Sequence, residues 1–191
     1  YNYAQLNGKV FNTNIPATMD SRVELWYKGD NLKSGDGYNN IISTTDTNNS
    51  NIFEIIYWSS NNDEVRARIG SSYVSANWDE TKWHHIIVSV SDGFVIDGEK
   101  KGDIQINSNI PNGRFTINGT YDLNSLRNAN GCFGMIKIDD VVIIPTADGF
   151  LNTNTGELLE VLKDGSYIFT ENLPTYGEGE LYKTINVDVI P

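Results

Sequence analysis

One stretch, residues 83–99, limits the fold of this chain more than any other. Over residues 86–90 apolar side chains recur at every second position, which is the period of a β-strand. A turn follows at residues 91–93, which end in a glycine that accepts a positive φ without steric cost. The chain returns over residues 94–96 and turns again at Asp97-Gly98, a strong hairpin signal. The stretch therefore predicts a β-hairpin with a second turn attached.

Short alternating segments continue along the rest of the chain. Residues 53–58 and 65–69 alternate around a polar turn and predict a second hairpin. Residues 22–27 predict a half-buried strand, and residues 131–144 form the most apolar run. Pro145 ends that run because proline cannot donate to a ladder. Shorter strands are expected at residues 40–44, 104–106 and 114–117.

Many short strands separated by regular turns predict an all-β sandwich of two antiparallel sheets. The length of 191 residues fits one large domain, which buries a core without covalent staples. Cys132 is the only cysteine, so an internal disulfide is excluded. We assign residues 1–145 to the sandwich. Residues 146–191 are assigned to a C-terminal β-hairpin extension that packs on the sandwich or completes it.

The charge balance narrows the class of partner. There are 25 acidic residues against 14 basic ones, and the formal net charge is −11. Nucleic acid and anionic membrane surfaces need a positive footprint, so neither is expected to bind. No apolar run is long enough to span a membrane, which excludes membrane insertion by a helix.

Two groups of residues resemble a known family. The first is Trp83-His84-His85 with the later Asp97-Gly98, and the second is the run over residues 133–141. Both resemble the signatures of laminin-G-like domains, which belong to the concanavalin A-like lectin/glucanase superfamily. The resemblance implies a jelly roll of two antiparallel sheets. It also implies a face or rim that binds glycans, often with calcium nearby. Residues 149–157 resemble a hairpin that follows such domains in bacterial surface and phage-tail proteins.

The acidic residues and histidines do not predict an enzyme. His84 and His85 are neighbours on a strand, so they point to opposite faces and cannot hold one metal together. Glycosidases use paired carboxylates, whereas Glu54 stands alone in its strand, and Asp139 is followed directly by another aspartate. A glycoside hydrolase that uses Glu54 or Asp139 in an unusual site remains a third hypothesis.

Calcium is the one cofactor that the sequence leaves open. The loop that begins at Asp46 carries side-chain oxygens at alternate positions, but it lacks the glycine and the final glutamate of an EF-hand. Asp46 and Asp139 are the candidate calcium ligands, each supplied by a different loop. The alternative is that they are solvated carboxylates that satisfy nearby backbone donors.

Four aromatic residues are candidates for contact with a sugar. A pyranose packs its C–H face on an aromatic ring, while its hydroxyls need a few well-placed polar partners. The candidates are Tyr38, Trp58, Tyr73 and Trp78, which lie in or beside segments rich in Asn and Asp. The alternative for each is a place in the core, which is the commoner position of Trp on a strand.

Together these observations predict a non-catalytic carbohydrate-binding, lectin-like module. The expected partner is a glycan or surface polysaccharide, and the expected location is extracellular or on a bacterial cell surface. The alternative is a structural or adhesive domain of a phage tail or surface assembly, which would bind other protein subunits through edge strands.

Overall fold

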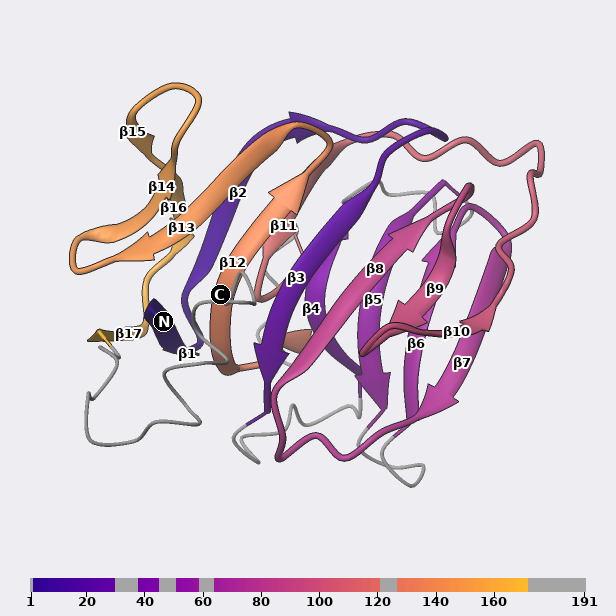
Figure 1. Cartoon of the computed structure of the whole chain (residues 1–191). Helices are drawn as coiled ribbons and strands as arrows, with labels where there is room; N and C mark the ends of the chain where they lie inside the picture. Colours follow the sequence, from indigo (N-terminus) through magenta and orange to yellow (C-terminus); the bar gives the residue numbers. More distant parts are fainter. Residues whose placement is uncertain (1, 30–37, 45–50, 59–63, 121–126, 172–191) are drawn as a thin grey trace.

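The structure, a computed structural model, describes residues 2–29, 38–44, 51–58, 64–120 and 127–171. These residues form two antiparallel sheets that pack face to face (Figure 1). The predicted all-β sandwich is therefore confirmed. The described residues contain no helix that is long and apolar enough to cross a membrane.

The ten-stranded sheet lies at the front in Figure 1. Its main path runs β10-β9-β8-β3-β12-β13-β14-β15, and β1 joins it by pairing with both β12 and β17. Its strands are β1 (Asn2–Asn7), β3 (Val23–Lys28), β8 (His84–Ser89), β9 (Gly93–Ile96), β10 (Glu99–Gly102), β12 (Gly131–Ile138), β13 (Val141–Thr146), β14 (Gly149–Asn152), β15 (Glu157–Leu158) and β17 (Ser166–Glu171).

The seven-stranded sheet lies behind it, in the order β16-β2-β11-β4-β5-β6-β7. Its strands are β2 (Val10–Pro16), β4 (Tyr38–Thr44), β5 (Phe53–Trp58), β6 (Glu64–Ile69), β7 (Ser72–Asn77), β11 (Arg114–Ile117) and β16 (Glu160–Lys163). The predicted hairpin of residues 53–58 and 65–69 is confirmed as β5 and β6, which pair from Phe53–Ile69 to Trp58–Glu64.

The core fills the space between the two sheets. Because side chains alternate along a strand, every second residue enters it, as the burial of Val23, Leu25 and Tyr27 on β3 shows. Eight of the twelve largest fully buried side chains are aromatic, and their ring contacts include Phe53 with Phe115 at 5.1 Å between centroids. Burying one such side chain contributes roughly 1.5–3 kcal/mol to the free energy of folding.

The residues of the family resemblance form a clamp at one end of β8. His84 is 8% exposed, and its Nδ1 donates to Asp97 Oδ2 at 2.7 Å while its Nε2 donates to the Asp79 carbonyl at 2.6 Å. Asp97 Oδ1 accepts from the His85 backbone N–H at 2.9 Å. Asp97 and Gly98 both have positive φ, 53° and 80°, as a type I′ turn requires. The signature is thus explained by the packing of the β9–β10 turn against β8.

One predicted strand is wrong. Residues 104–106 form no strand, although Ile104 is buried and Ile106 is 77% exposed. Side chains anchor this segment in place of a ladder: the Gln105 N–H donates to Ser72 Oγ, and Asn107 Nδ2 donates to the Ile69 carbonyl. The alternation was present, but no neighbouring strand edge pairs with it.

The described part of the C-terminal extension adds strands to both sheets. Strands β14 and β15 lengthen the ten-stranded sheet beyond β13, and β16 then pairs with β2 in the other sheet. Strand β17 returns to pair with β1. Residues 146–171 therefore lie against the N-terminal strands as part of one sandwich.

Candidate functional site on the seven-stranded sheet

A row of polar residues crosses the outer face of the seven-stranded sheet. Adjacent members are directly opposed on neighbouring strands, with one residue from each strand. From β16 to β7 this polar row is Glu160, Asn12, Thr116, Ser43, Glu54, Arg68 and Tyr73. With strands about 4.8 Å apart, it extends over roughly 29 Å.

The middle of the polar row is covered by the chain itself. Thr116 and Ser43 are fully buried, and Thr116 Oγ1 donates to the Gly119 carbonyl at 2.7 Å. Asn128 donates from Nδ2 to the Asn118 carbonyl at 2.6 Å, in the segment that follows β11. The row is therefore exposed at its two ends, one at Tyr73 and the other at Glu160.

At the Tyr73 end, an aromatic ring and a guanidinium group lie together. Tyr73 is 58% exposed, and the guanidinium carbon of Arg66 lies 4.5 Å from the centre of its ring. Arg66 Nε also donates to Ser75 Oγ at 3.4 Å, which fixes the arginine across strands β6 and β7. A cation held over one face of a ring leaves the rest of the ring for a ligand.

Glu54 lies behind this pair, on the next strand. It is half-buried, and its direct cross-strand neighbour is Arg68. Burial raises the pKa of the Glu54 carboxyl above its ordinary value, while the charges of Arg68, Arg127 and Arg66 act in the opposite direction. No hydrogen bond to the Glu54 side chain is found among the described residues, so this carboxyl retains acceptor capacity.

Asn40 adds an unsatisfied polar atom to the same face. Asn40 is 2% exposed, and its Nδ2 donates to Ser43 Oγ at 2.7 Å. Its Oδ1 is buried and has no hydrogen-bond partner in the described part of the chain. Buried polar atoms are nearly always paired, so this oxygen is one of a few exceptions among the described residues.

The predicted site residues are distributed unequally. Tyr73 lies at the open end of the polar row, and the backbones of Tyr38 and Trp58 pair with each other on β4 and β5 of the same sheet. The side chains of Tyr38 and Trp58, and the whole of Asp46, lie outside the described residues.

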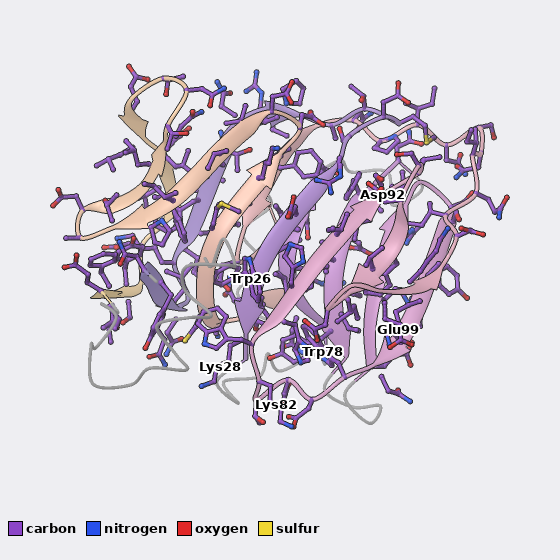
Figure 2. All side chains as sticks on the ribbon, in the orientation of Figure 1. Trp26, Lys28, Trp78, Lys82, Asp92 and Glu99 are labelled. Atoms are coloured by element: carbon purple, nitrogen blue, oxygen red, sulfur yellow. The ribbon has the colours of Figure 1, made fainter. Side chains whose placement is uncertain are left out.

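The expectation that Trp78 offers its ring to a ligand must be corrected. Trp78 is only 8% exposed, because the segment after β7 folds inward between the sheets. Its ring stacks on Tyr27 at 5.9 Å and on His84 at 5.0 Å. Trp78 is therefore a core residue; Figure 2 shows it beneath the lower end of β8.

Asp139 lies in the turn between β12 and β13, where its φ is 52°. Its Oδ1 accepts from the Arg22 backbone N–H at 3.0 Å, which is a common use of aspartate in a turn. Within the described ranges, no group of three or more His, Cys, Asp or Glu side chains could hold a metal ion. The described residues around Asp139 thus do not fit a calcium ion.

The positions of Glu54 and Asp139 also test the hypothesis of a glycoside hydrolase. Glu54 lies on the outer face of the seven-stranded sheet, whereas Asp139 lies at a turn of the ten-stranded sheet. Two carboxylates on different sheets cannot flank one glycosidic bond, as the mechanism of paired carboxylates requires.

The structure also reveals a network of hydrogen-bonded charged side chains on the outer face of the ten-stranded sheet. Arg22 donates to Glu24 at 2.9 Å and to Asp92 at 2.8 Å, and His85 Nε2 donates to Glu24 Oε1 at 2.7 Å. The His85 ring lies 4.8 Å from that of Trp26. Figure 2 shows Trp26 near the middle of this face and Asp92 towards its upper edge. Sequence reasoning missed this set because it depends on the pairing of β3 with β8.

No protein-family model matches this sequence, and no curated protein matches it. Among solved structures, the fold is similar to that of a native heptameric SAP-like pentraxin from Limulus polyphemus, with a TM-score of 0.56. The sequences are 15% identical, and the match covers 88% of this chain and 94% of the pentraxin chain. At this identity the likeness shows the fold alone. The predicted jelly roll of two antiparallel sheets is confirmed, and membership of the laminin-G-like family and of the concanavalin A-like superfamily stays a prediction.

Proposed function

We propose that this protein is a non-catalytic carbohydrate-binding domain, and that it binds a glycan or surface polysaccharide at the Tyr73 end of the polar row. One observation carries the proposal: Tyr73 is exposed and held by Arg66, with Glu54 two strands away on the same face. The ring offers a surface for sugar C–H groups. The guanidinium and carboxyl groups supply donors and acceptors for sugar hydroxyls.

The strands of Tyr38 and Trp58 support the same location. Both residues belong to the seven-stranded sheet: Trp58 lies two strands away from Tyr73, and Tyr38 lies three strands away. A protein displayed outside a bacterial cell would meet such glycans, and this setting remains part of the proposal. The expectation of calcium at Asp46 is part of it as well.

A glycan array tests the proposal directly. The purified chain is applied in calcium and, in parallel, in a chelator. Specific signal in both conditions supports a carbohydrate-binding domain, and signal lost in the chelator adds a calcium ion to the site. Tyr73→Ala should abolish the signal. Trp26→Ala, which removes an aromatic side chain from the opposite sheet, should retain it. A blank array in both conditions contradicts the proposal.

A second candidate function is a structural or adhesive domain of a phage tail or surface assembly. Three exposed apolar residues favour it: Leu158 at 50%, Val161 at 44% and Ile168 at 57%. They lie on β15, β16 and β17, which are terminal strands among the described pairings. Exposed apolar side chains on strand edges are suited to a protein partner. A stable trimer in a solution mass measurement would favour this function, and a monomer would favour the binding module.

A further inference from the structure

The other open end of the polar row leads into a cavity of about 430 Å³. It lies between the end of β2, the start of β11 and the chain from Asn152 to Glu160. We name it the hairpin pocket; its lining includes Asn12, Asn14, Arg114, Glu157 and Leu158. Its volume falls within the range of about 300–1,000 Å³ that is typical of small-molecule sites.

Two charged side chains of the hairpin pocket have no side-chain partner among the described residues. Arg114 makes no hydrogen bond or ion pair within the described residues, in contrast to Arg22, which has two carboxylate partners. Glu157 likewise has no side-chain partner in that part of the chain. The two charges do not pair with each other, so the pocket keeps one free donor group and one free acceptor group.

The backbone of β2 has an irregular conformation where it borders the hairpin pocket. Asn14 has a φ of 60°, in the left-handed region that asparagine adopts more readily than most other residues with a side chain. Asn12, only 4% exposed, holds it by accepting the Asn14 N–H on Oδ1 at 2.9 Å and donating from Nδ2 to Glu160 Oε2 at 3.2 Å. Thr13 Oγ1 donates to the Phe115 carbonyl at 2.7 Å. This turn of the backbone at Asn14 is therefore held by buried neighbours.

A register shift lies beside Asn14. The pairing of β2 with β11 shifts between Arg114 and Thr116, so that Arg114 opposes Pro16 while Thr116 opposes Asn12. Such irregularities redirect side chains and are common next to binding sites. At this one it places Arg114 on the pocket wall.

The chemistry of the lining selects a class of ligand. A guanidinium group only donates hydrogen bonds, a carboxylate only accepts them, and the amide of Asn14 does both. A plain anion would be repelled by Glu157 and Glu160, and a plain cation by Arg114. A neutral polyhydroxylated molecule satisfies all of these groups at once, and its C–H face can pack on Leu158, which is 50% exposed.

From this geometry we infer that the hairpin pocket is a second binding site, for a neutral sugar unit. The inference is independent of the site at Tyr73, because the covered middle of the polar row separates the two ends. One chain would then contact a polysaccharide at two places.

Amide-resolved NMR titration with neutral methyl pyranosides (gluco, galacto and manno) tests the inference. Saturable shifts are expected at Asn14, Arg114 and Leu158, and Arg114→Ala and Glu157→Gln should each weaken binding at least tenfold, about 1.4 kcal/mol. Glu99→Gln, an exposed acidic residue on β10, is the matched charge control and should bind as the wild type does. Thermal unfolding checks that each variant is folded.

Three outcomes would overturn the inference: no saturable shift at the pocket with any of the sugars, unchanged affinity in both pocket variants, or saturation of the pocket by acetate or tetramethylammonium in preference to the sugars. Tyr73→Ala separates this test from the proposed function. If the pocket binds normally in Tyr73→Ala while the array signal is lost, both sites stand, and either can fail alone.

Discussion

The outer faces of the two sheets differ in how their charged side chains are paired. On the ten-stranded sheet the charges satisfy one another. Hydrogen bonds from Arg22 and Ser89 lower the pKa of Asp92. Burial acts to raise the pKa of Glu24, but Arg22 and His85 outweigh it and the net shift is downward. On the seven-stranded sheet, burial raises the pKa of Glu54. One face therefore stabilises the fold, while the other keeps capacity that a ligand could use.

The largest expected effect concerns the clamp at β8. Asp97→Ala removes the acceptors of His84 Nδ1 and of the His85 N–H, and it places alanine at a φ of 53°. We expect a loss of about 2–4 kcal/mol in the free energy of unfolding, because a buried imidazole nitrogen is left unpaired. Urea denaturation measures it. Asp97→Asn, which tolerates this backbone conformation and keeps one acceptor, should lose clearly less. A loss of less than about 1 kcal/mol in Asp97→Ala would show that the hydrogen bonds contribute little.

Glu24→Gln tests the charged network on the outer face of the ten-stranded sheet. It removes the charge that Arg22 and His85 share, and we expect a loss of about 1–2 kcal/mol near neutral pH. Because the folded pKa of Glu24 is lowered, its stabilisation is present above the unfolded pKa and is lost as the pH falls through the folded pKa. Denaturation at several pH values should therefore show the variant and the wild type converging in acid. A constant difference would contradict the pairing.

Tyr73→Ala tests the open face. Binding of a glycan identified on the array should weaken at least tenfold, about 1.4 kcal/mol. The free energy of unfolding should change by no more than about 0.5 kcal/mol, as for most surface substitutions. Calorimetric titration and urea denaturation measure the two quantities. A large loss of stability with unchanged affinity would make Tyr73 a structural residue and remove the contrast between the sheets.

Glu54→Gln should have the smallest effect, and the opposite sign to Glu24→Gln. Because the folded pKa of Glu54 is raised, its ionised form is destabilising above that pKa, and the penalty disappears as the pH falls below the unfolded pKa. The neutral variant should be slightly more stable than the wild type at neutral pH, by on the order of 0.5 kcal/mol. The two proteins should converge in acid. A less stable variant at neutral pH would show that the arginines dominate.

Much of the fold could be predicted because it depends on local patterns. Alternation over residues 53–58 and 65–69, and the Asp97-Gly98 turn, are properties of neighbouring residues. The sites depend on contacts between distant segments. His85 meets Glu24 only because β8 pairs with β3, and the hairpin pocket exists only because β16 pairs with β2. Trp78 was placed wrongly because nothing in its neighbours indicates that the chain turns inward there.

The pairing of the first strand with β17 has a mechanical consequence. These strands are antiparallel, so Asn2 opposes Glu171 at one end of the ladder and Asn7 opposes Ser166 at the other. A pulling force applied between residues 2 and 171 acts on the Asn2–Glu171 end and loads the hydrogen bonds one pair after another. Such a ladder opens like a zipper, at lower force than one whose bonds are sheared together. Tension between these residues would thus separate β17 from β1 first, since β1 is also held by β12 and the described residues of β17 pair with β1 alone.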